Sequence, residues 1–137
     1  MAPVDFSGKW KTIEYDGMES YLRAMGSPEE VVMKHANWYP VQDIKQTADQ
    51  FVIDTGILDN RIEVLEFTVG TPFEFVVRGE TLTGYTYWEG KKLVLYTYSK
   101  QHCKVSKITR QLVGSKIIQT YAYTGSPEEG TRIFAKA

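Results

Sequence analysis

Apolar and polar residues alternate along most of the chain, in short runs rich in Val, Ile, Thr and Tyr, which is typical of β-strands. Ten such runs are predicted as strands: Phe6–Tyr15, Trp38–Lys45, Phe51–Thr55, Arg61–Phe67, Phe73–Arg78, Thr81–Trp88, Lys91–Ser99, Val105–Val113, Lys116–Thr124 and Thr131–Ala135. Glycine-containing turns separate several of them, at 78–80, 89–90 and 114–115. A meander with this many strands avoids open edges best by closing on itself. The pattern therefore predicts an all-β fold, a ten-stranded up-and-down antiparallel β-barrel.

The residues between the first two strands follow a helical period instead. A first helix is predicted at 17–25, where one face is apolar and carries Met18, Tyr21, Leu22 and Met25. Gly26 ends this helix. A second helix is predicted at 28–36, with Ser27 as N-cap and Pro28 at the first helical position. This short helix-turn-helix would cap one end of the barrel.

The pentapeptide Gly-Ser-Pro-Glu-Glu occurs twice in the chain. Its first copy, at 26–30, leads into the second predicted helix, where Glu30 would complete a capping box with Ser27. Its second copy, at 125–129, is followed by Gly130 and a short strand, so we expect a hairpin loop there. The residues that follow each copy decide the structure it adopts.

Length and charge restrict the class of protein. The 137 residues are predicted to form one domain over residues 1–137, which is long enough to bury a core without disulfides. The formal net charge of −1 gives no overall attraction to nucleic acid. A single cysteine, Cys103, cannot form an internal disulfide, and the first residues do not have the pattern of a signal peptide. No stretch approaches the ~18 apolar residues of a membrane span. We expect a cytoplasmic protein.

Arginines occupy positions that strand alternation would place on inward faces. Ile108 and Leu112 share one face of their strand, and Arg110 lies between them on the same face. Arg132 likewise shares a face with Phe134 in the last strand. In one of its two possible registers, the strand before it would place two further polar residues on the inward face, Gln119 and Tyr121. A buried arginine is costly unless it is paired, so an inward face of this kind suits a cavity that holds water and an anion. The alternative is that these arginines are solvated on the surface.

Patterns that would indicate catalysis or metal binding are weak. His102 and Cys103 are adjacent in the sequence. Because neighbours on a strand point in opposite directions, we do not expect them to form a catalytic Cys-His dyad. His35 falls at the end of the second predicted helix, where a histidine interacts favourably with the helix dipole. Two histidines and one cysteine show no metal-ligand spacing, and no glycine loop suits a phosphate. We expect no enzymatic activity, no metal and no cofactor.

Five segments in order carry a family resemblance. The first is an aromatic residue followed by Gly-x-Trp, and the second is an acidic-x-Tyr-aliphatic helix that ends in glycine; the segments are 6–10, 18–26, 108–112, 114–118 and 131–134. With these motifs the chain resembles the intracellular lipid-binding proteins, the fatty-acid- and retinoid-binding proteins of the cytosol. The resemblance covers essentially the whole chain.

The resemblance implies a site for a ligand carboxylate, which this family binds with two inward arginines and a tyrosine. It implies that Arg110 acts through water and that Arg132 acts directly. The tyrosine position is Phe134 in this chain, and phenylalanine cannot donate a hydrogen bond. Tyr121 or Tyr123 is a candidate for the missing hydroxyl.

Two further positions depart from the family pattern. Thr12 stands where an aliphatic residue is usual, and Met18 stands where an aromatic residue is usual. Met18 belongs to the helical cap near the family's ligand portal, and its flexible side chain would admit a different ligand shape. The other parts of the portal are expected at the Ile57-Leu58 and Thr71-Pro72 turns.

The resemblance implies a monomeric, non-catalytic carrier that binds one long-chain fatty acid in the barrel. A retinoid, a bile acid or another bulky hydrophobic acid is an alternative ligand. Two other classes stay open: a structural, membrane-associated barrel, and a lipid-modifying enzyme. For the carrier, transient membrane contact would be made through the helical cap.

Overall fold

Ten strands and two short helices make up the protein, in a computed structural model that describes residues 2–35, 39–57, 60–77, 79–101 and 103–137. The strands are β1 (Gly8–Asp16), β2 (Val41–Thr47), β3 (Gln50–Ile57), β4 (Asn60–Thr68), β5 (Phe73–Val77), β6 (Glu80–Glu89), β7 (Lys92–Ser99), β8 (Lys104–Val113), β9 (Lys116–Tyr123) and β10 (Glu129–Lys136). The helices are α1 (Met18–Ala24) and α2 (Glu29–His35). Five predictions fall outside the described residues, those for Ala36, Trp38, Leu58, Arg78 and His102.

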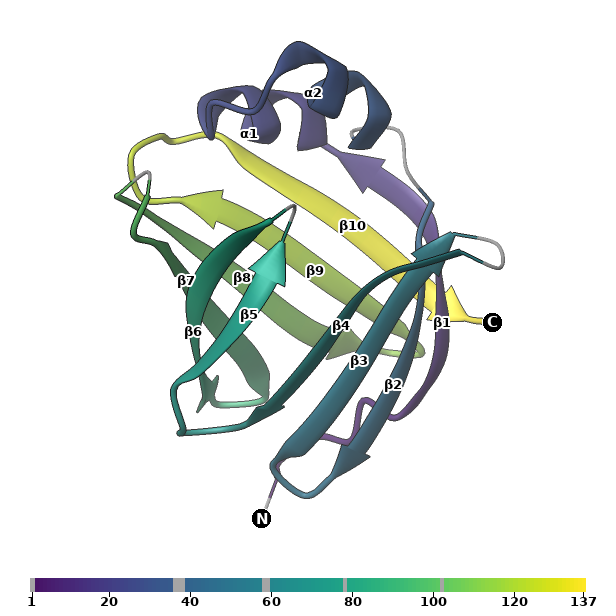
Figure 1. The fold of residues 1–137 in the computed structure, drawn as a ribbon. Coiled ribbons are helices and arrows are strands. Elements are labelled where there is room, and N and C mark those ends of the chain that lie inside the picture. The colour runs from purple at the N-terminus through teal and green to yellow at the C-terminus, as the bar shows by residue number, and fades with distance from the viewer. Residues whose placement is uncertain (1, 36–38, 58–59, 78, 102) are drawn as a thin grey trace.

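All ten strands join one antiparallel sheet in the order β4-β3-β2-β1-β10-β9-β8-β7-β6-β5. Strands that follow one another in the chain pair with each other, except β4 with β5, and β1 also pairs with β10, for example Tyr15 with Arg132. Within the described residues no ladder joins the two remaining edges, β4 and β5, which leaves the barrel nearly closed (Figure 1). The predicted ten-stranded up-and-down barrel is confirmed.

The two helices lie across one end of the barrel, and the N-terminus lies at the opposite end (Figure 1). Helix α1 packs against β9 and β10. A Cβ added at Gly130 of β10 would lie 2.5 Å from Sδ of Met18. The absence of a side chain at Gly130 therefore lets α1 approach the sheet and brings Met18 down towards the interior.

The ends of the elements differ from the predictions by a few residues. The first helical hydrogen bond of α2 runs from the Val32 N–H to the Pro28 carbonyl, so Pro28 holds the cap position predicted for Ser27. The first strand begins at Gly8 rather than at Phe6. Phe6 precedes the strand because its N–H donates to Oε1 of Gln46, at 2.7 Å, instead of entering a ladder.

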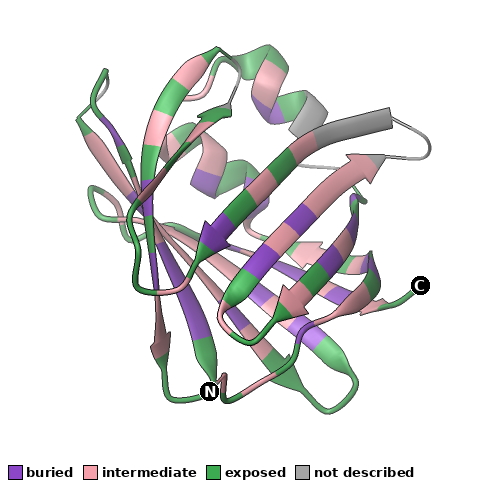
Figure 2. Ribbon diagram, turned by 60° about the horizontal axis from the view of Figure 1, so that its bottom comes forward, coloured by how far each residue is buried: buried purple, intermediate pink, exposed green. Residues whose placement is uncertain are grey.

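The apolar core fills only the end of the barrel opposite the helices. Its buried members are Phe6, Trp10, Ile44, Phe51, Ile53, Phe67, Leu93, Ile117 and Phe134. A second, smaller cluster lies under the helices and is built on Met18 and Tyr21. Buried and exposed residues alternate along the strands, as a barrel with one face inward requires (Figure 2). The space between the two clusters is where the barrel interior is hollow.

Candidate functional site

A cavity of about 300 Å³ lies inside the barrel between the helical cap and the apolar core. Most of its lining is apolar and comes from many strands, including Ile53, Leu65, Phe75, Leu82, Leu95 and Ile108. Three of the described lining residues are charged: Arg110, Arg132 and Glu63. Two positive charges and one negative charge give the lining one net positive charge. A cavity of this size and character is typical of a site for a small hydrophobic ligand.

Arg110 on β8 reaches across the barrel interior, and only 7% of its surface is exposed. Its Nη2 donates to Oε1 of Gln119, at 2.8 Å, and to Oε1 of Gln42, at 2.9 Å. Gln119 is its register partner on β9, whereas Gln42 lies on β2, which is not a neighbour of β8 in the sheet. The two glutamine amides therefore hold the guanidinium between β9 and β2 in the lining of the cavity.

The charge of Arg110 is only partly offset by the groups around it. Burial lowers the pKa of Arg110 to about 10, while Tyr121 and Glu63 partly offset this effect. The guanidinium is therefore still protonated at neutral pH. Among the residues that the structure describes, no carboxylate forms an ion pair with it, and its buried Nε has no hydrogen-bond partner. An uncompensated buried cation of this kind favours the entry of an anion.

Arg132 on β10 is buried beside Tyr121 on β9, with 6% of its surface exposed. Its Nη1 donates to the Tyr121 hydroxyl at 3.2 Å, and its guanidinium lies 5.4 Å from the centroid of the same ring, within the range of a cation–π contact. The Tyr121 ring packs against Tyr21 of α1, at 5.7 Å between centroids. The helical cap thus helps to position the tyrosine beside the arginine.

Five of the six residues predicted for the site line the cavity, namely Arg110, Arg132, Gln119, Tyr121 and Met18. The sixth, Phe134, is completely buried in the apolar core and is not among the lining residues. Its register partner Thr12 is also buried, and the Thr12 hydroxyl donates to the Pro40 carbonyl at 2.8 Å. Position 134 therefore forms part of the packed floor beneath the cavity.

Five polar lining residues were missed by the sequence analysis: Gln42 on β2, Thr55 on β3, Glu63 on β4, Thr97 on β7 and Ser106 on β8. The signal was present in the alternation of each strand. Glu63 shares a face with Leu65 and Phe67, and Gln42 shares one with Ile44. A polar residue in an inward register was the clue to each of them.

A second hollow, of about 570 Å³, opens beside the cavity. It lies among the α1–α2 connection, the β5–β6 turn and the β7–β8 end of the barrel, and it shares Met25, Leu82, Thr97 and Ser106 with the cavity. This second hollow, called the vestibule below, therefore adjoins the cavity beside the helical cap. Lys104 borders it and donates from Nζ to the Met25 carbonyl at the end of α1.

The prediction that the Thr71-Pro72 turn belongs to the portal is wrong. This turn joins β4 to β5 at the end of the barrel opposite the helices (Figure 1). Val69, just before it, packs against the apolar core. The error has a simple cause: β4 begins at the end of the barrel near the helices (Figure 1), so the connection that follows β4 must lie at the other end of an up-and-down barrel.

The described residues contain neither a cluster of metal-ligating side chains nor a membrane-spanning helix. No group of three or more His, Cys, Asp or Glu side chains is placed to hold a metal ion among them. No described helix is long and apolar enough to cross a membrane.

Comparison with known proteins gives relatives over most of the chain, although no family model matches. The chain is 34% identical to the liver fatty acid-binding protein of Schroederichthys bivius over 116 residues, which cover 85% of this chain and 77% of that protein. It is 35% identical to retinol-binding protein 1 of Rattus norvegicus over 100 residues, which cover 66% and 69% of the two chains. In fold it is similar to the crystal structure of apo lipid binding protein 8 of Caenorhabditis elegans, with a TM-score of 0.85 at 21% identity over 96% of this chain and 95% of that one. These relatives show that the chain belongs to the intracellular lipid-binding protein family, together with the fatty acid- and retinol-binding proteins.

Proposed function

We propose that the protein is a non-catalytic carrier that holds one long-chain fatty acid, or a similar hydrophobic carboxylate, in its cavity. The observation that carries the proposal is the buried Arg110 guanidinium, which has two neutral amide partners and no described carboxylate in ion-pair contact. Arg132 adds a second cation to the same lining. A ligand carboxylate would compensate this charge, and its hydrocarbon tail would replace water along the apolar walls.

The tail would supply most of the affinity. Each buried CH2 contributes about 0.8 kcal/mol, so roughly a dozen buried carbons give a gross ~10 kcal/mol. Ordering and desolvation offset much of this, which leaves an affinity of about micromolar or tighter. A charge-assisted contact between arginine and carboxylate adds on the order of 1.5–3 kcal/mol. The arginines therefore select the headgroup and hold the ligand in register.

Retinol is the second candidate, because a retinol-binding protein is among the relatives. An alcohol would leave the buried charge of Arg110 uncompensated, and this favours the carboxylate. Retinoic acid and bile acids carry a carboxylate, but their rigid ring systems fit a cavity of about 300 Å³ less readily than a flexible chain does. A fatty acid therefore suits both the charge and the shape of the site.

We propose further that the ligand enters through the vestibule, by loosening of the helical cap, and that the carrier is a cytoplasmic monomer over residues 1–137. Met25 borders both hollows and accepts, through its carbonyl, the hydrogen bond from Lys104. That contact must break or bend when the cap opens. The remaining rivals, a membrane-associated structural barrel and a lipid-modifying enzyme, require a stable membrane complex or turnover of a lipid.

Titration calorimetry on the lipid-free protein tests the carrier hypothesis with four ligands: palmitic acid, methyl palmitate, retinol and retinoic acid. We expect one palmitic acid per chain at micromolar affinity or tighter, and methyl palmitate about tenfold weaker or more because it lacks the charge. Equal binding of the acid and the ester would contradict the role of the arginines. Tighter binding of retinol than of palmitic acid would favour the retinoid alternative, and chemical conversion of a ligand would favour the enzyme.

A further inference from the structure

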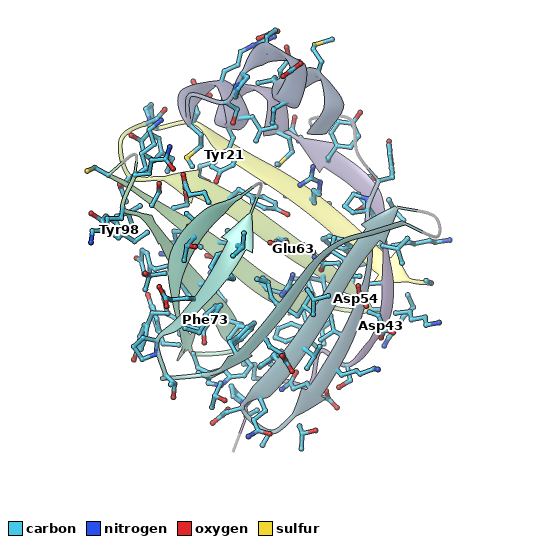
Figure 3. The ribbon with its side chains drawn as sticks, viewed as in Figure 1. Tyr21, Asp43, Asp54, Glu63, Phe73 and Tyr98 are labelled. Atoms are coloured by element: carbon cyan, nitrogen blue, oxygen red, sulfur yellow. The ribbon has the colours of Figure 1, made fainter. Side chains whose placement is uncertain are left out.

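Glu63 is an acidic residue on the inward face of β4. It lines the cavity, as does Leu65 two residues later, whereas Val64 between them is 41% exposed and Glu66 is also exposed. In Figure 3 Glu63 lies near the middle of the barrel in that view, beside β4. A carboxylate in this position is unexpected in a site that favours an anion, because it would repel the headgroup of a plain fatty acid.

Register places Glu63 at the end of a row of polar side chains on one wall of the cavity. Thr55 on β3 is its register partner, and Gln42 on β2 is the register partner of Thr55. The Gln42 amide donates from Nε2 to the Thr55 hydroxyl at 3.2 Å, and its Oε1 accepts from Arg110. A continuous polar path therefore runs from the cation of Arg110 along this wall towards Glu63.

A second row faces it from the other wall, where Arg110, Gln119 and Arg132 are register partners on β8, β9 and β10. One wall therefore offers hydrogen-bond donors and positive charge, and the other ends in an acceptor with negative charge. An ionised carboxylate is acceptor-only and has about four acceptor positions, so Glu63 can accept from a ligand as well as interact within the protein. A headgroup that satisfies both walls must contain an anion and a donor close together.

We propose that Glu63 determines ligand specificity by accepting a hydrogen bond from a hydroxyl group close to the ligand carboxylate, so that the preferred ligand is a hydroxylated fatty acid. This inference rests on the proposed function, because the arginines must first hold the carboxylate. The ligand hydroxyl donates a hydrogen bond to the Glu63 carboxylate, and this attraction replaces the repulsion between Glu63 and the ligand headgroup. Hydrogen bonds that involve a charged partner are roughly twice as strong as neutral ones, and burial strengthens them further.

The test compares palmitic acid with β-hydroxypalmitic acid on four forms of the protein: wild type, Glu63→Leu, Glu63→Gln and Glu66→Gln. Calorimetry gives the ratio of the two dissociation constants for each form, and thermal denaturation shows that each is folded. We expect wild type to prefer the hydroxylated acid by about tenfold. Glu63→Leu should abolish that preference and bind palmitic acid more tightly than wild type does. Glu66→Gln removes a carboxylate from the outer face of the same strand and should keep the wild-type ratio.

Glu63→Gln keeps an acceptor of the same shape without the charge, so its preference should fall between those of wild type and Glu63→Leu. This variant decides the matter if Glu63→Leu does not fold. Equal affinities of wild type for the two acids, or an unchanged ratio in the folded Glu63 variants, would overturn the inference and leave the carrier function intact. An equal gain in affinity for both acids in the Glu63 variants would also overturn it. That result would mean that Glu63 only balances the charge of the arginines when no ligand is bound. Failure of wild type to bind either acid would contradict the proposed function itself.

Discussion

The hydroxyl group that faces Arg132 belongs to Tyr121, and it accepts a hydrogen bond from Nη1 of that arginine at 3.2 Å. It therefore comes from β9, the strand next to Arg132, and not from position 134 on β10. Phe134 is fully buried in the core below. Of the two tyrosines considered from the sequence, Tyr121 lines the cavity beside Arg132, and its role as the missing hydroxyl stays a prediction.

Tyr121→Phe removes only this hydroxyl and keeps the ring against Tyr21. We expect the affinity for palmitic acid to fall by about threefold to tenfold, the usual contribution of one hydrogen bond, because Arg132 loses the group that orients it. Calorimetry with palmitic acid measures the loss. Tyr123→Phe is the matched control, because Tyr123 lies two residues further along β9 and outside the cavity lining. This variant should bind palmitic acid as wild type does. An unchanged affinity in Tyr121→Phe would show that the hydroxyl does not support the headgroup site.

Arg132→Ala tests the cation directly. We expect palmitic acid to lose at least tenfold in affinity, whereas methyl palmitate, which has no charge for Arg132 to bind, should lose much less. The same titrations as above give both values. The two ligands losing affinity to the same extent would mean that Arg132 supports the cavity wall only and does not select a carboxylate.

The helical cap should loosen at acidic pH. Arg23 of α1 donates from Nη2 to Oε1 of Glu29 at the start of α2, at 2.6 Å, and this hydrogen bond holds the pKa of the Glu29 carboxyl below its ordinary value. A lowered folded-state pKa means that the contact stabilises the folded cap above the ordinary pKa and is lost as pH falls through the folded-state value. The pair is exposed, so the effect on overall stability is small.

The dissociation rate of methyl palmitate, a ligand that does not itself titrate, measures this loosening by stopped flow. We expect the rate to be constant near neutral pH and to rise as pH falls below about 4.3, the ordinary pKa of a glutamate, in wild type. Glu29→Gln should dissociate faster already at neutral pH and respond less to acid. Glu30→Gln, on the same helix, serves as the control, because the described hydrogen bonds of Arg23 go to Glu19 and Glu29. A dissociation rate that does not change with pH in wild type would show that this ion pair does not control opening of the cap.

Membrane contact through the cap would have little electrostatic help. Between residues 18 and 35 the chain carries three acidic and two basic side chains, Glu19, Glu29, Glu30, Arg23 and Lys34. Each basic residue near an anionic surface contributes about 1 kcal/mol, and the acidic excess cancels this gain. We therefore expect the transfer of a fluorescent fatty acid to vesicles to be no faster with anionic than with neutral lipid. A strong acceleration by anionic lipid would show that another, basic surface makes the contact.

Alternation predicted most of the fold, because each strand has one face towards the interior and the other towards solvent. The twofold occurrence of Gly-Ser-Pro-Glu-Glu shows what local sequence leaves open. The copy at 26–30 leads into α2, and the copy at 125–129 forms the loop before β10, as the residues that follow each copy had indicated.

Strand alternation predicted the candidate site less completely than it predicted the fold. The inward arginines followed from single strands, but the contact of Arg110 with Gln42 joins residues 68 positions apart on strands that are not neighbours. Alternation also placed Phe134 with Arg132 on one face, yet it could not tell cavity from packed core, because that depends on height along the barrel axis. Glu63 was missed because an acidic residue in a strand is usually at the surface.

Most of the dense packing and the polar part of the cavity lining occupy different levels of this barrel. The apolar core lies at the end opposite the helices, and the arginines, the glutamines and Glu63 lie above it around an open space. If the proposed function holds, a substitution among the latter would change which ligand the cavity binds and would leave intact the apolar core that stabilises the fold. Evolution could therefore change the ligand of such a protein one residue at a time without altering the apolar core of the barrel.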